Sequence, residues 1–470
     1  MLTITLEPHG AQPLYEQLYR GIRHKIEQGA LAAGERLPSK RALAAHLKVS
    51  VVTVEGAYGQ LLAEGYLRSE PKRGFFVQPF EAQSAPAAIP ARPSAAASVK
   101  EKSIQYDFTT NAVDTARFPF STWARLMREV LTQEDSGLLA ASHPQGVEEL
   151  RQAIVRYLGD FRGIQAEPEQ IVVGAGSEYL TGLLTQLLGR EGGYAVEDPG
   201  YRKPARILAN NGAQVLPIPL DAQGLRVDLL ERSRARVAHV TPSHHFPLGM
   251  VMPVTRRRAL LSWAGQSEDR YIIEDDYDSE FRFSGRPIPA LQSLDTGERV
   301  VYLNTFAKSL APSLRISYMV LPPHLLARYR QELQFYSSTV PSFEQYTLAR
   351  FMERGHFERH IARMRTLYKG IRDSLLFAAR EEGITSRGTF SGAEAGLHLL
   401  LQMNNGMTEP ELVRRAAEAG VGVYPLSSYY LAPGTRSALP TLVMGYARMR
   451  GEDMAPAFSL LRKAWALDRP

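Results

Sequence analysis

Apolar residues near the start of the chain recur at the spacing of a helix that buries one face. These residues are Leu14, Leu18, Ile22 and Ile26. Two further helices are expected. One begins at Ser39 or Lys40 and buries Leu43 and Leu47, and the other follows Ser50, which is a plausible N-terminal cap. Gly65 is expected to end the last helix, and short strand-like runs follow at residues 66–68 and 75–77. This order of elements predicts a winged helix-turn-helix, which we assign to residues 1–80.

The pattern changes after this first region. Residues 82–100 are rich in Ala, Pro and Ser and lack aromatic or periodic apolar positions. Such a segment cannot bury enough surface to offset the entropy of ordering, so we expect a linker at residues 81–103. Residues 104–470 alternate short β-branched runs with longer helical patterns. That alternation predicts an α/β domain with a mostly parallel sheet and crossover helices.

Composition narrows the class of protein. The chain has 470 residues, a formal net charge of +6 and no cysteine. The positive charge permits binding to a polyanion without establishing it, and the lack of cysteine excludes disulfides and thiolate metal sites. No metal site is predicted. No apolar run approaches the roughly 20 residues of a membrane span, and the start of the chain lacks the pattern of a signal peptide. We therefore expect a cytoplasmic protein without membrane contact.

Two motifs of the large domain follow strand-like runs. Gly176 and Ser177 lie between the run at residues 171–173 and a helical pattern, where backbone amides at a helix N-terminus suit a phosphate. Asp275, Asp276 and Tyr277 follow a second buried run, at the end where open α/β sheets bind ligands. One of the two carboxylates could pair with a protonated pyridine nitrogen. The pattern alone does not separate Asp275 from Asp276, and a solvated acidic loop is the alternative.

Lys308 lies between two apolar runs, where a permanent charge is unfavourable. Desolvation lowers the pKa of a lysine and favours the neutral amine that forms a Schiff base. Thr305 and Arg315 flank it and supply donors that suit a phosphate. Tyr201 follows a Pro-Gly turn, and its ring could stack on a planar cofactor. These motifs together predict one cofactor site.

The segment ERLPSKRALAAHLKVSVVTVEGAYGQLLAEGYLRSEPKRGFFV closely resembles the DNA-binding domain of GntR-type regulators. The resemblance implies binding to double-stranded promoter DNA, with the helix after Ser50 in the major groove and the hairpin tip against the backbone or minor groove. The expected DNA contacts are Ser39, Lys40, Arg41, Ser50, Val51, Thr53, Lys72, Arg73 and Gly74. Val51 stands where the family usually has an arginine, so an arginine contact to guanine or phosphate is lost there. A module for protein contacts, with its basic residues merely solvated, is the alternative.

The large domain resembles fold-type I aminotransferases, and the chain apart from the linker resembles the MocR family of regulators, especially its GabR-like branch. The phrases that carry the resemblance are TPSHHFPLG, IIEDDYDSEFRF and TFAKSLAPSLRISYMVLPP. It implies pyridoxal 5′-phosphate as the cofactor, with an internal aldimine on Lys308, Asp275 at the pyridine nitrogen, Tyr277 at the ring hydroxyl and Tyr201 stacked on the ring. The implied phosphate ligands are Gly176, Ser177, Thr305 and Arg315. It also implies a homodimer that is domain-swapped head-to-tail, the DNA-binding module of one chain packing on the large domain of the other.

The chain departs from the GabR-like pattern at three positions near the implied ligand site. Lys203 and Ser428 stand where that branch has arginines, and His245 stands where it has glutamine. A γ-aminobutyrate-type ligand held by two arginines is therefore not expected. Arg206 and Arg436 could substitute for them, or could form ordinary surface ion pairs. We expect an effector that is a primary amine with an anionic group.

The resemblance favours a bacterial transcription regulator that associates with the nucleoid when it is bound to DNA. An amino compound would displace Lys308 from the cofactor, giving an external aldimine, and so shift the conformational population that binds DNA. A working aminotransferase with an appended DNA-binding module is the alternative. The loss of the expected carboxylate-binding arginine argues against efficient turnover of ordinary α-amino acids. A large domain that serves only as a dimerisation scaffold is disfavoured, because every cofactor-contacting residue type is retained.

Overall fold

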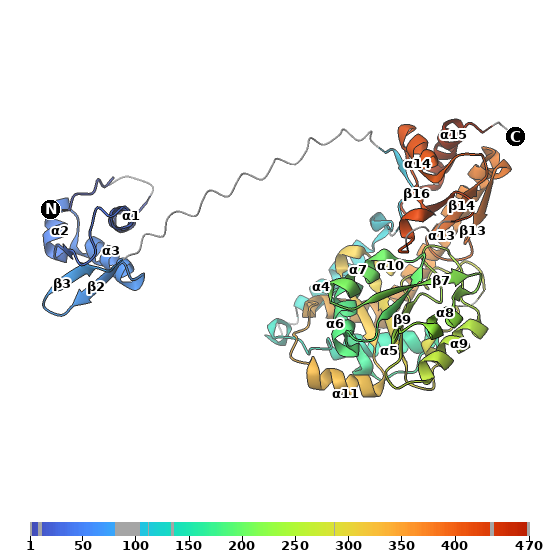
Figure 1. Cartoon of the computed structure of the whole chain (residues 1–470), viewed down its shortest axis with the longest axis horizontal. Coiled ribbons are helices and arrows are strands. Elements are labelled where there is room, and N and C mark those ends of the chain that lie inside the picture. Colours follow the sequence, from blue (N-terminus) through green and yellow to red (C-terminus); the bar gives the residue numbers. More distant parts are fainter. Residues whose placement is uncertain are drawn as a thin grey trace. The chain divides into compact units, whose positions relative to one another are not determined.

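The computed structural model describes residues 2–7, 12–79, 104–110, 112–132, 136–285, 287–432 and 437–467. The chain divides into two compact units, Met1–Val99 and Lys100–Pro470 (Figure 1). The linker expected at residues 81–103 lies outside the described residues. Among the helices of the described ranges, none combines the length and the apolar character needed to cross a membrane.

The first unit is a winged helix-turn-helix, as predicted. Its elements are α1 (Leu14–Glu27), β1 (Arg36–Leu37), α2 (Lys40–Leu47), α3 (Val51–Ala63), β2 (Leu67–Glu70) and β3 (Gly74–Val77). Leu18 and Ile22 of α1 and Val54 and Leu61 of α3 are fully buried, so the predicted helical stripe forms the core. The strands form one antiparallel sheet in the order β1-β3-β2. The two-residue strand β1 was not predicted, because a run of that length carries no period-2 pattern.

Serine side chains cap both α2 and α3, of which the cap at Ser50 was predicted. The Ser39 hydroxyl accepts a hydrogen bond from the Ala42 amide at 3.2 Å. The Ser50 hydroxyl accepts one from the Thr53 amide at 3.0 Å. Each bond helps to satisfy an amide in the first turn of the helix, where the regular helical partners are missing. The caps therefore fix where the helices α2 and α3 begin.

The second unit is built on an eight-stranded sheet with the strand order β5-β12-β11-β10-β9-β6-β7-β8. The strands are β5 (Ile171–Gly174), β6 (Tyr194–Asp198), β7 (Val215–Asp221), β8 (Gly224–Leu225), β9 (Val237–Val240), β10 (Tyr271–Asp275), β11 (Val300–Thr305) and β12 (Ser317–Val320). Neighbours from β11 through β7 are parallel, whereas β12 runs antiparallel to both β5 and β11. The mostly parallel sheet is thus confirmed.

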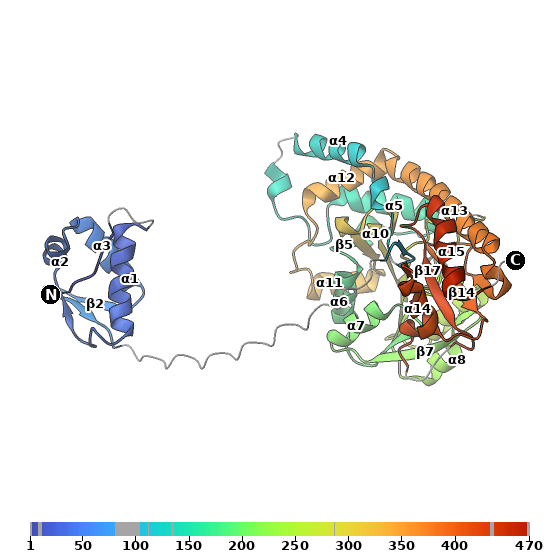
Figure 2. The same cartoon turned by 90° about the horizontal axis from the view of Figure 1, so that it is seen from above.

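Helices cover both faces of this sheet (Figure 2). Their bounds are α4 (Phe120–Leu131), α5 (Glu148–Arg162), α6 (Ser177–Leu188), α7 (Arg202–Asn210), α8 (Val227–Arg232), α9 (Val254–Gly265), α10 (Phe306–Ser309), α11 (Pro323–Glu332), α12 (Ser342–Glu353) and α13 (His356–Glu381). Successive residues of β5 serve opposite faces: Val173 packs with α5 and α12, and Val172 with α6 and α11. This two-sided burial explains why the strands are almost continuously apolar.

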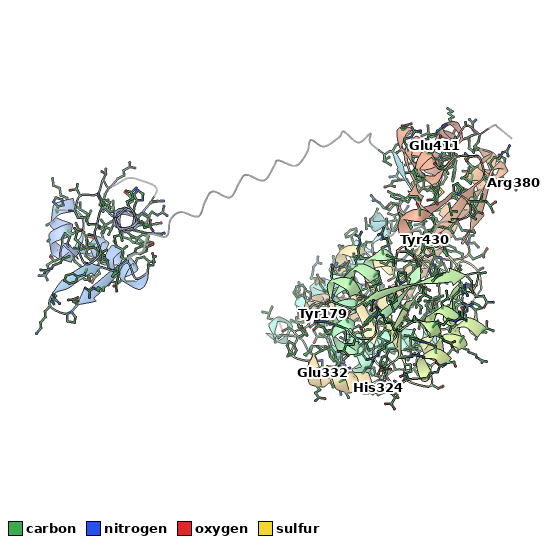
Figure 3. All side chains as sticks on the ribbon, in the orientation of Figure 1. Tyr179, His324, Glu332, Arg380, Glu411 and Tyr430 are labelled. Carbon is green, nitrogen blue, oxygen red and sulfur yellow. The ribbon has the colours of Figure 1, made fainter. Side chains whose placement is uncertain are left out.

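A smaller antiparallel sheet follows toward the C-terminus, with the strand order β13-β14-β17-β16. Its strands are β13 (Gly388–Ser391), β14 (His398–Met403), β16 (Tyr424–Pro425) and β17 (Thr441–Gly445), and the helices α14 (Glu409–Glu418) and α15 (Met454–Ala464) accompany it. The Asp198 carboxylate, at the end of β6, accepts hydrogen bonds from the amides of Leu431 and Ala432 at 2.7 and 3.0 Å. These two residues lie in the loop between β16 and β17. Tyr430, labelled in Figure 3, precedes this junction. The bonds fix the smaller sheet's loop against the edge where the parallel strands end.

Candidate functional site

A cavity in the large unit lies at the carboxyl ends of the parallel strands. Its empty volume, open solvent at the mouth included, is about 830 Å³. The residues that line it are Gly176, Ser177, Glu178, Tyr201, Lys203, Thr241, Phe246, Asp275, Tyr277, Thr305, Ala307, Lys308, Pro312 and Arg315. They follow the ends of β5, β6, β9, β10 and β11, which share one edge of the sheet. All eight residues expected at the cofactor are among them.

Lys308 lies in the single-turn helix α10, directly after β11. Burial lowers the pKa of Lys308 to about 8, against the opposing charge of Asp278, and the nearby charge of Lys203 lowers it further. A substantial fraction of Lys308 is therefore in the neutral amine form near neutral pH. This is the state that attacks a carbonyl carbon.

The structure separates the two aspartates that the sequence left open. Asp275, the last residue of β10, lines the cavity and lies 3.5 Å from His239 Nε2. Asp276 points away into the core, where its carboxylate forms a buried ion pair with Arg162 at 2.9 Å and accepts a hydrogen bond from Tyr302 at 2.5 Å. Asp275 is thus the carboxylate that is available to a cationic group in the cavity.

The backbone amides in the first turn of α6 are not capped by a side chain, so they can donate to a ligand. Gly176 precedes this helix with φ +93°, a conformation that favours glycine, and a Cβ there would collide with the Arg315 guanidinium. Arg315 itself has φ +53° and donates from Nη2 to the Ala175 carbonyl at 3.2 Å. The Thr305 hydroxyl accepts from the Ala307 amide and from Ser317, so its own proton is free to donate. Amides, guanidinium and hydroxyl at one end of the cavity form a donor set that suits a phosphate.

A buried hydrogen-bond network supports Tyr277. Its hydroxyl lies 3.1 Å from His244 Nδ1, and the Asp278 carboxylate lies 3.0 Å from the same nitrogen. Burial raises the pKa of Tyr277 well above its ordinary value, with the charge of Asp278 acting in the same direction. The hydroxyl therefore stays protonated and can donate a hydrogen bond. The ring of Tyr201, at the start of α7, meets Phe246 edge-on with 5.6 Å between centroids and remains partly exposed at the cavity.

Of the predicted effector contacts that the structure describes, Lys203 alone lines the cavity, and the Ser428 carbonyl accepts a hydrogen bond at 3.1 Å from Arg202, which is adjacent to Lys203 in sequence. Lys203 lines the cavity, but it forms an ion pair with Glu178. Arg206 is exposed three residues farther along α7 and does not line the cavity. Ser428 is also exposed and outside the lining, and its hydroxyl donates to the Pro425 carbonyl at 2.8 Å. Arg436 lies outside the described residues.

His245 is placed behind the cavity rather than in it. Its side chain is 2% exposed, and Nε2 lies 3.5 Å from the carboxylate of Glu197. Burial lowers the pKa of His245 to about 3, so the imidazole is neutral. Burial also raises the pKa of Glu197 to about 7. The adjacent residue His244, not His245, bonds to Tyr277.

Sequence reasoning did not single out five lining residues, which are Glu178, Thr241, Phe246, Ala307 and Pro312. Thr241 and Phe246 belong to the phrase TPSHHFPLG, which follows β9, and the strand-end rule that located Asp275 could have located them. The Thr241 amide and hydroxyl donate to Glu197 at 3.0 and 2.7 Å. Glu178 directly follows Ser177, but a carboxylate beside a predicted phosphate site carries no sequence signal of its own.

The predicted DNA contacts fall on the exposed parts of the small unit. Val51 and Val52 begin α3 and are 43% and 75% exposed. Thr53 is less exposed, and its hydroxyl lies 2.8 Å from that of Ser50. Arg41 is exposed near the start of α2. The start of α3 thus presents apolar and hydroxyl groups that could read base edges.

Several basic residues of this unit have partners within it. Lys40 forms an ion pair with Glu55 at 2.5 Å, and Arg73 forms one with Glu70 at 2.6 Å. Lys72 and Gly74 have φ values of +61° and +116°, which form the tight tip of the β2–β3 hairpin. Exposed ion pairs of this kind are weak, so a phosphate can compete for Lys40 and Arg73.

Comparison with known proteins assigns both units to families. Residues 14–77 match the family of bacterial regulatory proteins named gntR, and residues 103–441 match aminotransferase class I and II. The chain is 39% identical to the HTH-type transcriptional regulator YdeL of Bacillus subtilis, over 97% of each chain. It is 34% identical to the probable rhizopine catabolism regulatory protein MocR of Rhizobium meliloti, over 98% of this chain and 96% of that one.

Among solved structures, kynurenine aminotransferase of Pyrococcus horikoshii, in complex with PMP, matches with a TM-score of 0.67 and 25% identity. The match covers 78% of this chain and 92% of that chain. The aminotransferase family and this neighbour imply pyridoxal 5′-phosphate as the cofactor. The cavity fits it, because an amine of lowered pKa, a carboxylate and a phosphate-type donor set line one space. The chain therefore belongs to the MocR family of transcription regulators, in which a GntR-type DNA-binding domain is joined to an aminotransferase-like domain.

Proposed function

We propose that this regulator senses a primary amine at Lys308 and changes its DNA binding in response. The observation that carries the proposal is the single cavity in which Lys308, Asp275 and Arg315 meet, in a chain that also holds a winged helix-turn-helix. When bound, pyridoxal 5′-phosphate supplies an aldehyde carbon to which an amine can attach. Covalent chemistry then serves recognition, because only a ligand with a free amino group can replace the lysine.

The side chains of the chain divide this task. Asp275 holds a proton at the pyridine nitrogen, and Tyr277 donates a hydrogen bond at the ring hydroxyl. Thr305, Arg315 and the amides of Gly176 and Ser177 hold the phosphate. These roles are supported by the position of each group in the cavity. Lys308, once displaced by a ligand amine, is free to take up a proton, because its pKa of about 8 lies above neutral pH.

The proposal is tested on the full-length chain. Binding to promoter DNA is followed by fluorescence anisotropy while primary amines and amino acids are added, and the absorbance of the cofactor is recorded in parallel. A ligand that changes the absorbance should also change the affinity for DNA. Lys308→Ala should lose both responses and should lose the covalent attachment that borohydride traps. A change in DNA affinity that persists in Lys308→Ala would contradict sensing at this residue.

The proposed division of the chain follows the predicted bounds. Residues 1–80 would be the DNA-binding domain and residues 104–470 the sensing domain, joined by the linker at 81–103.

We further propose that the protein is a domain-swapped homodimer. Two variants would be mixed, one with Arg41→Ala in the first domain and one with Lys308→Ala in the second. In a domain-swapped dimer, the intact DNA-binding domain of the Lys308→Ala chain packs on the intact large domain of the Arg41→Ala chain, so the mixed dimer should respond to the amine. Without the swap, that DNA-binding domain packs on a large domain that lacks Lys308, and the response should be absent. Light scattering measures the mass of the wild-type chain, and a monomeric mass would contradict the proposal.

A second candidate function is amino-group transfer. It is favoured by one observation, the presence of Lys308, Asp275 and Tyr277 together in the cavity. Incubation with an amino donor and a keto acid would show multiple turnovers if the chain is an aminotransferase. A change in absorbance without turnover would favour the regulator alone.

A further inference from the structure

One carboxylate stands among the groups that would hold the cofactor phosphate. Glu178 is the second residue of α6, and its neighbour Tyr179 is labelled in Figure 3. It lines the same cavity as Lys308. One of its oxygens pairs with Lys203 and the other pairs with Arg315. An ionised carboxylate can only accept hydrogen bonds, so it is unlike every other group expected to face the phosphate.

The geometry at Arg315 makes Glu178 and a phosphate compete for one nitrogen. Arg315 Nη2 donates both to the Ala175 carbonyl, at 3.2 Å, and to the Glu178 carboxylate. This nitrogen carries two protons, and both are engaged by these contacts. A phosphate can therefore accept from Nη2 only after one of these two contacts opens, whereas the three protons on Nη1 and Nε remain for other acceptors. If the contact with Glu178 opens, Arg315 keeps its second anchor, the Ala175 carbonyl.

The charges at this end of the cavity lead to the same conclusion. Arg315 and Lys203 supply two positive charges, and Glu178 removes one of them. Contact with Lys203 and Arg315 lowers the pKa of Glu178, although partial burial opposes this, so the carboxylate is ionised at neutral pH. A phosphate monoester carries about −1.5 to −2 charges at that pH. The two cations alone would balance it, whereas the N-terminus of α6 contributes only about half a charge.

We propose that Glu178 is a built-in competitor for the phosphate of the cofactor. Its negative charge opposes that of the phosphate beside Arg315, and a phosphate that takes the Nη2 proton now facing Glu178 breaks this ion pair, whereas the ion pair with Lys203 remains. The carboxylate thus weakens the binding of the phosphate, and an anionic group of the effector reaches Lys203 only by displacing Glu178. This inference rests on the cofactor placement in the proposed function.

The test uses the full-length protein freed of cofactor. Dissociation constants are measured by absorbance for pyridoxal 5′-phosphate and for pyridoxal, which lacks the phosphate. Glu178→Gln should bind pyridoxal 5′-phosphate about tenfold more tightly than wild type, as expected from the loss of one like charge near a partly exposed dianion. Its affinity for pyridoxal should stay the same. Inorganic phosphate, measured by calorimetry on the same proteins, should also bind Glu178→Gln more tightly.

Two variants control for side effects of the substitution. Glu178→Asp keeps the charge and should keep the affinity of wild type for pyridoxal 5′-phosphate. Glu231→Gln removes an exposed carboxylate of α8, remote in sequence from the cavity residues, and should leave both affinities unchanged. Circular dichroism shows whether each variant is folded. A tighter Glu178→Gln beside an unchanged Glu178→Asp supports competition by charge.

Three results would overturn the inference. Weaker binding of pyridoxal 5′-phosphate to Glu178→Gln would mean that Glu178 holds Arg315 in place for the phosphate. An equal gain for pyridoxal and pyridoxal 5′-phosphate would mean that the effect does not act through the phosphate. Equal affinities of wild type and Glu178→Gln would refute the competition and leave the proposed function intact. A wild-type protein that binds no pyridoxal 5′-phosphate would instead refute the proposed function, and this inference with it.

Discussion

The lowered pKa of Lys308 has a kinetic consequence that can be measured. Only the neutral amine attacks the aldehyde of the cofactor, so the rate of covalent attachment follows the neutral fraction. With a pKa of about 8, roughly a tenth of Lys308 is neutral at pH 7, compared with about 0.04% for an ordinary lysine of pKa 10.4. The burial of this one amine therefore accelerates attachment about 200-fold at pH 7, if all else is equal.

The assay mixes cofactor-free protein with pyridoxal 5′-phosphate over a range of pH and follows the absorbance by stopped flow. Borohydride reduction and peptide mapping then assign the attachment to Lys308. The second-order rate should rise about tenfold per pH unit below pH 8 and should level off above it. Attachment at Lys463, which is exposed on α15, gives the reference rate within the same chain.

Lys203 provides the matched perturbation, since its charge is one of the causes that lower the pKa of Lys308. Lys203→Gln should move the levelling of the rate to higher pH, and Lys203→Arg, which keeps the charge, should not. A rate at Lys308 that climbs steadily to pH 10 in wild type would refute the reasoning. It would show that the amine is solvated and that burial does not prepare it for attack.

Three further predictions concern the phosphate end, the core and the DNA-binding unit. Gly176→Ala should weaken binding of pyridoxal 5′-phosphate at least tenfold, because the new Cβ would displace the Arg315 guanidinium and strain a backbone at φ +93°. Unchanged binding in a spectroscopic titration would contradict the placement of the phosphate beside Gly176 and Arg315. Arg162→Met should lower the free energy of unfolding in urea by about 3 kcal/mol, because it leaves the buried Asp276 unpaired, and an effect below about 1 kcal/mol would show that this carboxylate is solvated or protonated. Arg41→Ala and Arg73→Ala should each weaken binding to all DNA sequences and reduce the slope of log affinity against log salt by about 1, whereas Thr53→Ala should alter base preference; unchanged affinity and selectivity in all three would remove this contact map.

The cofactor residues could be predicted because both their position at strand ends and their side-chain chemistry can be read from the sequence. Ligands bind where parallel strands end, and β5, β10 and β11 each end in a motif whose chemistry is visible in the sequence. The same two kinds of information could not decide between Asp275 and Asp276. Successive residues at a strand end face opposite sides, and the sequence does not say which side holds the cavity. The partner of Asp276 is Arg162, more than a hundred residues earlier in the chain.

The effector contacts were harder to predict, for a related reason. Lys203 and Glu178 meet because α6 and α7 pack side by side, and each sequence segment alone suggests a free charge. His244 and His245 are neighbours in sequence, yet one bonds to Tyr277 and the other lies beside Glu197. Such assignments depend on how loops cross the edge of the sheet, and no periodic pattern records that crossing.

The lining residues that the cofactor does not contact constrain which effector the cavity can bind. Arg315, Asp275 and Tyr277 are committed to the cofactor in the proposed arrangement, and Lys203 is already paired with Glu178. An anionic ligand gains little from Lys203, since it exchanges one carboxylate for another in a partly exposed ion pair. The remaining lining is Thr241, whose hydroxyl already donates to Glu197, and the apolar residues Phe246, Ala307 and Pro312. We therefore infer that specificity comes mainly from the amine, through its covalent attachment, and from the shape of its apolar part, and that an anionic group, which must displace Glu178 to reach Lys203, contributes little.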